Sequence, residues 1–197
     1  MSLLDSAYEE VIENFLKGDW ETVIEAQALL NEPYFLWPKP RKHDLYFIVD
    51  SMKILHIERI LSIGCGSGLL EWLLMAASDL KVTGIEIDKN YWKSKYARKC
   101  FIDLVFPQDE AFSEIICKEN NALMFCYFNN MDAFLKYLSV YPGHCLIIIG
   151  PENCGKHTEP CPFDENIPNE WELWKSREIS TTGDFISIYI KRKENIL

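Results

Sequence analysis

Three glycines alternate with other residues in the stretch Gly64-Cys-Gly66-Ser-Gly68, directly after the short apolar run at residues 59–63. Glycine adopts positive φ angles without a steric penalty and lets another molecule approach the backbone closely. The helix-forming residues that follow would offer unpaired N–H groups and a positive dipole end to a ligand. This order of strand, tight turn and helix predicts a site for a nucleotide-type ligand.

The spacing of the glycines separates the classes of nucleotide-type ligand. The dinucleotide fingerprint needs a small third residue for close packing of helix on strand, and Leu69 occupies that position. No Gly-Lys-Ser/Thr follows the glycines, so the phosphate-binding loop of ATP-type enzymes is absent. The loop therefore disfavours NAD, FAD and ATP.

Two acids stand at the end of the next apolar run, residues 81–88. Glu86 lies 20 residues after Gly66, a spacing compatible with an acid that binds a ribose. A carboxylate can accept hydrogen bonds from both hydroxyls of a ribose. We therefore expect Glu86 to bind ribose, with Asp88 as the alternative.

Alternating strands and helices are expected to position these residues. We predict strands at 59–63, 81–88, 103–106, 122–128 and 145–149, and helices at 45–56 (capped by Asp44), 69–78, 90–102, 110–118 and 131–140. Residues 172–179 and 185–191 are separated by turn residues and predict a C-terminal antiparallel hairpin. The order indicates an α/β fold with a doubly wound, Rossmann-like, mostly parallel sheet of seven strands.

The N-terminal part of the chain differs from the rest in charge. Residues 1–35 contain eight acids and one base, a net charge of −7 out of −10 for the whole chain. We interpret residues 1–42 as an acidic helical extension with a proline- and aromatic-rich linker, and residues 43–197 as the main domain. The extension is expected to pack on that domain; the alternatives are a docking surface for a protein partner or a lid over the site. The overall charge makes nucleic acid an unlikely partner.

Length and composition limit the class of protein. The 197 residues, 48% of them hydrophobic, suffice for one core. No apolar stretch approaches the roughly 20 residues of a membrane span, and the first residues lack the features of a signal peptide. We therefore expect no membrane association, and we expect the seven cysteines to be reduced thiols in the cytoplasm, with the nucleus as the alternative.

Two motifs resemble those of the class I S-adenosylmethionine-dependent methyltransferases. They are Ile-Gly-Cys-Gly-Ser-Gly-Leu at 63–69 and Val-Thr-Gly-Ile-Glu-Ile-Asp at 82–88, and the resemblance extends over residues 45–193. It implies S-adenosylmethionine or S-adenosylhomocysteine as the cofactor. The cofactor-binding residues that it implies are Gly64, Cys65, Gly66 and Gly68 in the loop, Glu86 on the ribose with Ile87 beside it, and Gln108 or Asp109 at the adenine.

The chain departs from one motif of this family. Amino methyltransferases of one large group carry Asn/Asp-Pro-Pro-aromatic at the end of the fourth strand, whereas this chain has Cys126-Tyr-Phe-Asn-Asn130. Tyr127 could stack on a substrate, and Asn129 or Asn130 could orient one; alternatively Asn130 only caps the next helix. The resemblance implies methyl transfer to a small-molecule or protein acceptor. The alternative is a catalytically degenerate protein that uses the fold as an interaction module.

The stretch Gly68-Leu-Leu-Glu71 and the later loop Ile149-Gly-Pro-Glu-Asn-Cys-Gly155 resemble little-described methyltransferase-like proteins, which implies an uncharacterised substrate. In the long loop at 150–169, Cys154, His157 and Cys161 have zinc-like spacing, but a structural zinc needs four ligands. We therefore expect no metal and interpret this loop as a substrate lid. The basic residues between 89 and 99 are expected on a solvated helix face, or against the acidic N-terminal helices.

Overall fold

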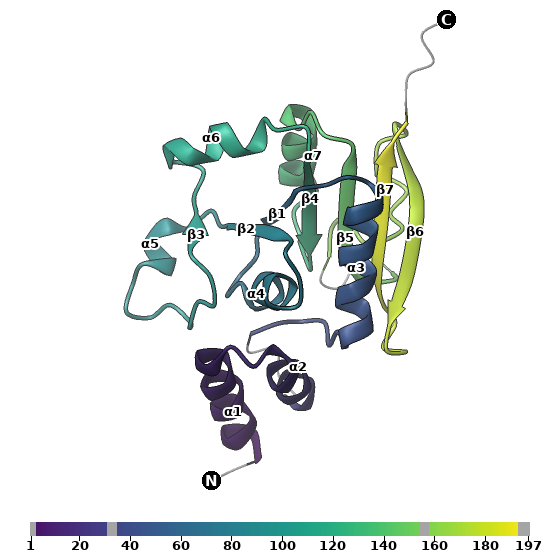
Figure 1. Cartoon of the computed structure of the whole chain (residues 1–197). Helices are drawn as coiled ribbons and strands as arrows, with labels where there is room; N and C mark the ends of the chain where they lie inside the picture. The colour runs from purple at the N-terminus through teal and green to yellow at the C-terminus, as the bar shows by residue number, and fades with distance from the viewer. Residues whose placement is uncertain (1–2, 31–34, 154–157, 193–197) are drawn as a thin grey trace, which may run out of the picture.

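The computed structural model describes residues 3–30, 35–153 and 158–192. Figure 1 shows the element order along the chain. The elements are α1 (Leu3–Lys17), α2 (Trp20–Leu29), α3 (Lys42–Ile54), β1 (Arg59–Ile63), α4 (Leu69–Ala76), β2 (Lys81–Ile85), α5 (Lys89–Trp92), β3 (Leu104–Val105), α6 (Glu110–Ile116), β4 (Asn121–Cys126), α7 (Met131–Val140), β5 (Cys145–Pro151), β6 (Trp171–Ile179) and β7 (Asp184–Lys191).

The strands form one seven-stranded sheet with the order β3-β2-β1-β4-β5-β7-β6. β1 pairs in parallel with both β2 and β4, whereas β7 runs antiparallel to β5 and β6. This arrangement confirms the predicted Rossmann-like sheet with its C-terminal hairpin. The strand order reverses between β1 and β4, and ligands of such sheets bind at the carboxyl ends of the strands beside this point.

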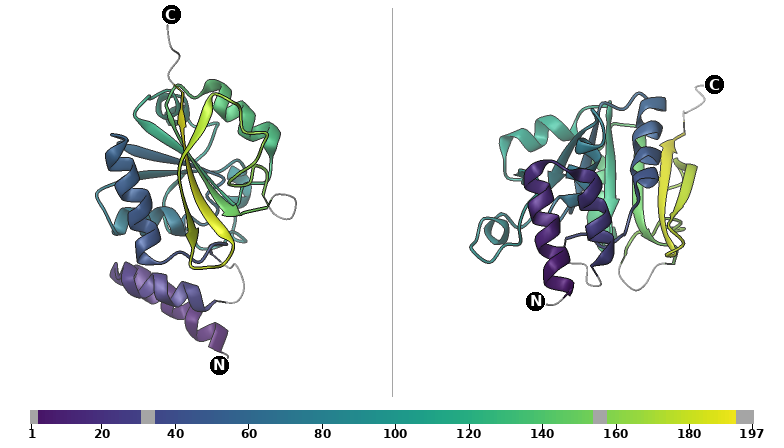
Figure 2. Two further views of the ribbon diagram at one scale, coloured as in Figure 1. Left: turned by 90° about the vertical axis from the view of Figure 1, so that its right-hand side faces the viewer. Right: turned by 60° about the horizontal axis from the view of Figure 1, so that its bottom comes forward.

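Helices cover both faces of the sheet, and Figure 2 shows α3 and α7 on opposite sides of it. One hydrophobic core joins the sheet to α2, α3 and α4, and a second joins it to α6 and α7. β4 lies between the two cores, and its residues 122–125 are completely buried. Burial on both faces explains why this strand is a continuous apolar run without alternation.

The N-terminal extension packs on the main domain, near the end of the sheet toward which β4 points (Figure 1). Phe15 of α1 makes edge-to-face contacts with Trp72 and Phe101, at centroid distances of 5.0 and 4.8 Å. Gln27 of α2 is buried and donates hydrogen bonds to the carbonyls of the linker that follows. Leu29, the last residue of α2, is 70% exposed.

Two of the predicted helices are wrong in detail. The helix expected at 90–102 ends at Trp92, and the chain then continues in turns. Asp44 is not the N-cap of α3, which is Arg41, but it contributes to the cap from the first turn as part of a capping box. Its buried carboxylate accepts hydrogen bonds from the Arg41 N–H at 2.8 Å and from Arg177 Nε at 2.9 Å. Asp44 thus connects the start of α3 to β6.

The cysteines also differ from expectation. Cys161 is disulfide-bonded, so the seven cysteines are not all reduced thiols, while Cys65, Cys100, Cys117, Cys126 and Cys145 are free. Cys154 and His157, the other members of the zinc-like set, lie outside the described residues. A disulfide-bonded sulfur is not the thiolate that zinc binds. None of the helices described here has the length and apolarity that crossing a bilayer requires.

Candidate functional site

The glycine loop connects β1 to α4 through three left-handed residues. Gly64, Gly66 and Gly68 have φ angles of 69°, 61° and 78°, a region that residues with a Cβ rarely adopt. The Gly64 N–H donates to the Ile85 carbonyl at 2.8 Å and fixes the loop against the end of β2. A Cβ on Gly66 would have no atom of the described part of the chain within 4 Å, so the backbone here is open to a ligand.

Glu86 reaches from the end of β2 to this loop. Its Oε1 accepts a hydrogen bond from the Gly66 N–H at 2.6 Å, and the Trp92 side chain also hydrogen-bonds to the carboxylate. Burial raises the pKa of Glu86, and both hydrogen bonds oppose this rise by stabilising the ionised form. Asp88, the alternative acid, is exposed and caps α5 by accepting from the Tyr91 N–H at 2.9 Å.

Two cavities meet at the glycine loop, and Gly64 and Tyr127 line both. The first, here called the Glu71 cavity, has a volume of about 260 Å³ and is also lined by Trp37, Glu71 and Arg98. The second, the Glu86 cavity, has a volume of about 280 Å³ and lies between the ends of β1, β2 and β4 and the start of α7. An elongated ligand lying across the loop would occupy both.

Glu71 is a buried acid in the first turn of α4, only 1% exposed. Its Oε1 accepts a hydrogen bond from Ser62 Oγ at 2.5 Å, while Oε2 is buried without a hydrogen-bond partner among the described residues. Burial raises the pKa of Glu71 to about 7 against the opposing hydrogen bond from Ser62. A carboxyl group with this pKa can hold or release a proton near neutral pH.

Tyr127 stands at the junction of the two cavities. Its φ of 51° is left-handed, which is unusual for a residue with a large side chain and typical of functional sites. Its hydroxyl donates to Asp184 Oδ1 at 2.7 Å, and its ring stacks on Trp37 at a centroid distance of 5.4 Å. Burial, followed by Asp184, raises the pKa of Tyr127. The hairpin and the linker therefore hold Tyr127 from two sides.

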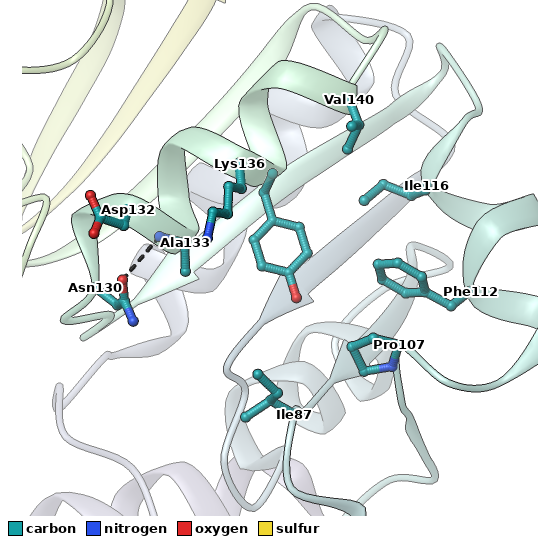
Figure 3. A pocket seen from close by; sticks show the side chains of 10 residues that line it. Ile87, Pro107, Phe112, Ile116, Asn130, Asp132, Ala133, Lys136 and Val140 are labelled. Atoms are coloured by element: carbon teal, nitrogen blue, oxygen red, sulfur yellow. Dashed lines mark hydrogen bonds between the residues drawn. The ribbon is translucent and has the colours of Figure 1, made fainter.

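The two asparagines after Tyr127 have different places. Asn130 caps α7, with its Oδ1 accepting from the Ala133 N–H at 2.9 Å (Figure 3), as the capping alternative predicts. Asn129 is exposed and lines the Glu86 cavity, and its strand-like bridge to Glu159 brings the long loop beside the site. Between Tyr127 and Asn129, the Phe128 ring lies over Gly64: a Cβ on this glycine would be 3.1 Å from it.

Of the two predicted adenine contacts, Asp109 already has other hydrogen-bond partners and Gln108 lies outside the cavities described above. Asp109 Oδ1 accepts from Lys89 Nζ, and Oδ2 accepts from the Phe106 N–H at 3.0 Å. These bonds hold the pKa of Asp109 below its ordinary value. Gln108 is exposed and lines none of the three cavities described here.

A larger hollow of about 560 Å³ continues from the Glu86 cavity, with which it shares Ile87, Asn130, Ala133 and Tyr137. Figure 3 shows Pro107, Phe112 and Ile116 on one side of this hollow and the α7 side chains on the other. Lys136 and Asp132 provide its charged groups. This hollow gives a flat apolar ring a place that the sequence did not indicate.

Several residues of the site were not among the cofactor-binding or catalytic residues predicted from the sequence. Trp37 and Arg98 come from the linker and from the segment after α5, and Asp184 begins β7. Tyr137 lies on the inward side of α7. The only usable signal was Glu71, an acid inside the apolar helical run Leu-Leu-Glu-Trp-Leu-Leu at residues 69–74. An acid in such a position is normally paired or functional.

Comparisons with known proteins bear on the fold. The sequence matches no family model and no curated protein. An rRNA methylase from Escherichia coli has a TM-score of 0.51 at 16% identity, covering 95% of this chain and 77% of the other. The 16S rRNA methylase RmtB has a TM-score of 0.48 at 14% identity, covering 95% and 75%. An S-adenosylmethionine-dependent methyltransferase from Aquifex aeolicus has a TM-score of 0.42 at 14% identity, covering 75% and 88%.

The likeness to the Escherichia coli methylase agrees with the strand order 3-2-1-4-5-7-6 and its single antiparallel strand, β7. At 16% identity it concerns the fold and not the substrate. Fold alone does not determine function, which depends on the site. The chain has the fold of the class I S-adenosylmethionine-dependent methyltransferases.

Proposed function

We propose that this protein binds S-adenosylmethionine across the glycine loop and transfers its methyl group to a small-molecule or protein acceptor. The observation that carries the proposal is the contact between Glu86 and the Gly66 N–H at 2.6 Å. It brings an acid that can accept ribose hydroxyls to a glycine backbone that is open to a ligand.

The cavities suggest how the cofactor would lie. Its ribose would meet Glu86, and its adenine would lie beside Ile87 and Tyr137, toward the apolar hollow. Its amino-acid end would enter the Glu71 cavity, where Arg98 and Glu71 provide charges of both signs. Gly64 and Tyr127, which line both cavities, would then lie near the sulfur.

When bound, the cofactor supplies a methyl group on a sulfonium, which is a strong electrophile. The protein therefore needs mainly to align the acceptor with that methyl group and to exclude water. Tyr127 suits this task because Asp184 and Trp37 restrain it at the junction of the cavities. Phe128, next to it, covers Gly64 with an apolar ring.

The test compares two acids that lie two residues apart, Glu86 at the glycine loop and Asp88 at the start of α5. We would titrate S-adenosylhomocysteine into the wild type, Glu86→Gln and Asp88→Asn by calorimetry, with NAD as the control ligand. Removing the charge of Glu86 should weaken binding about tenfold or more, because hydrogen bonds to charged groups contribute roughly 1.5–3 kcal/mol. Asp88→Asn should bind like the wild type, since Asp88 only caps α5. Absence of binding to the wild type, or a preference for NAD, would refute the proposal.

A second candidate is a non-catalytic binding module. The Tyr127 hydroxyl and the Asn130 Oδ1 already have structural partners, Asp184 and the Ala133 N–H, which occupy the groups that would orient an acceptor. Cell extract with radiolabelled S-adenosylmethionine distinguishes the two candidates. A labelled product supports the transferase, whereas cofactor binding without any labelled product supports the module.

A further inference from the structure

Glu71 has no assigned task in methyl transfer, yet its position is unusual. It is buried in the first turn of α4 and lines the Glu71 cavity. Ser62 satisfies Oε1, and Oε2 has no partner among the described residues. A buried carboxylate oxygen without a donor is unfavourable, so an ionised Glu71 calls for a hydrogen-bond donor from a ligand.

The groups around Glu71 explain its protonation. Ser62 faces it from β1, Cys65 from the loop, Glu86 from the end of β2 and Cys126 from the end of β4. Burial and the negative charge of Glu86 raise its pKa, and the Ser62 hydrogen bond only partly offsets them. Without a ligand, a large share of the protein therefore carries a proton on Glu71 at neutral pH.

The lining of the Glu71 cavity suits a ligand that carries a positive and a negative charge side by side. Glu71 lies on its lining together with Arg98, and the aromatic rings of Trp37 and Tyr127 form part of its wall. An ammonium group can donate to Oε2 and contact an aromatic face, while a carboxylate suits a guanidinium. The combination matches the zwitterionic end of an α-amino acid.

We propose that Glu71 selects ligands whose end in this cavity carries a primary ammonium group, and that their binding releases the proton held by Glu71. The inference rests on the proposed function, in which that end is the amino-acid part of the cofactor. The protonated carboxyl group gives its proton to solvent, and the resulting carboxylate pairs with the ammonium, which keeps its own protons. No covalent bond of the ligand changes.

Comparing two ligands measures how much the amino-acid end, with its ammonium group, contributes to binding. S-adenosylhomocysteine carries the amino-acid end, whereas 5′-methylthioadenosine has the same adenine, ribose and sulfur but lacks that end. Each would be titrated by calorimetry into the wild type, Glu71→Gln and Glu58→Gln. Glu58 is an exposed glutamate just before β1, so Glu58→Gln makes the same chemical change outside the cavity.

We expect the wild type to bind S-adenosylhomocysteine about eightfold more tightly at about pH 7.5 than at about pH 6, since Glu71 must be ionised in the complex. Titrations in buffers of different ionisation enthalpy should show a net release of protons on binding. Glu71→Gln should weaken binding about tenfold at about pH 7.5 and remove most of the pH dependence. Its affinity for 5′-methylthioadenosine should stay within about twofold of the wild type, and Glu58→Gln should behave like the wild type.

The results of these titrations distinguish a failure of the proposed function from a failure of the role of Glu71. If neither ligand binds the wild type, the proposed function fails. If S-adenosylhomocysteine binds the wild type and Glu71→Gln equally at both pH values, the role of Glu71 fails while the proposed function stands. If Glu71→Gln weakens both ligands equally, Glu71 only supports the loop and the inference is overturned. Thermal unfolding of each variant shows that it is folded.

Discussion

Replacing Gly68 with alanine tests why the loop needs its third glycine. Gly68 has a φ of 78° directly before α4, and its backbone faces Ile102, from the segment after α5. A Cβ at this position would lie 2.9 Å from Ile102 Cδ1 and closer still to Cγ1. An alanine would therefore meet both backbone strain and a steric clash.

The two effects can be estimated separately. A left-handed φ costs a residue with a Cβ about 1–2 kcal/mol. Overpacking against Ile102 adds about 1–3 kcal/mol. Gly68→Ala should thus destabilise the protein by roughly 2–5 kcal/mol. Gly18 has nearly the same φ, 75°, but no atom of residues 3–30, 35–153 or 158–192 lies within 4 Å of a Cβ there, so Gly18→Ala should cost only about 1–2 kcal/mol.

Urea unfolding at equilibrium measures both variants, and equal m values allow their midpoints to be compared. Combining Gly68→Ala with Ile102→Ala should recover about 1–3 kcal/mol relative to the sum of the single changes, because the clash is gone. The reasoning is refuted if Gly68→Ala costs no more than Gly18→Ala, or if the double variant is additive.

Three further predictions concern the site. The pKa of Glu71 is raised from 4.5 to about 7 in the folded protein. The protonated side chain therefore contributes fully to the free energy of unfolding below about pH 4.5, and this contribution is lost as the pH rises through about 7. The free energy of unfolding should fall by ~3 kcal/mol over this range. Urea midpoints at pH values of about 5 and 8 should show this loss in the wild type and not in Glu71→Gln; equal losses would contradict the assignment. Asn130→Ala should lower the free energy of unfolding by about 1 kcal/mol because α7 loses its cap, whereas Asn130→Asp should keep the cap and the stability. Equal unfolding midpoints for the two variants would argue against capping. Tyr127→Phe removes the hydroxyl that donates to Asp184. The free energy of unfolding should fall by about 1–3 kcal/mol at neutral pH and by less in acid, where Asp184 is protonated. A loss of stability that does not depend on pH would show that this hydrogen bond is not the cause.

The glycine loop and Glu86 could be predicted because their signals are local. Three left-handed positions require glycines, and a buried parallel strand requires an apolar run. Once β1 and β2 are parallel neighbours, their carboxyl ends lie at the same edge of the sheet, so Glu86 must come near the loop. The fold and the core of the site follow from these local requirements.

The segment after β2 shows where local signals fail. Residues 90–102 have helix-forming lysines and aromatic residues, but α5 ends at Trp92. Lys89 with Lys93, and Lys95 with Lys99, would be like charges one helical turn apart. None of the side chains at 93–100 is buried, and Tyr96 is 76% exposed, so this stretch has no buried apolar face that would stabilise a longer helix before Phe101 reaches the core.

The sequence by itself determined the order of the elements, the parallel sheet and the loop, since these depend on periodicity and on the backbone angles of single residues. Only the tertiary structure decided the partners of the polar groups. Asp109 meets Lys89, and Tyr127 meets Asp184 from a strand 57 residues later. Glu71, by contrast, has an oxygen beside a cavity for which the described residues provide no hydrogen-bond partner. Such pairings depend on the positions of side chains from distant segments, which no local pattern encodes.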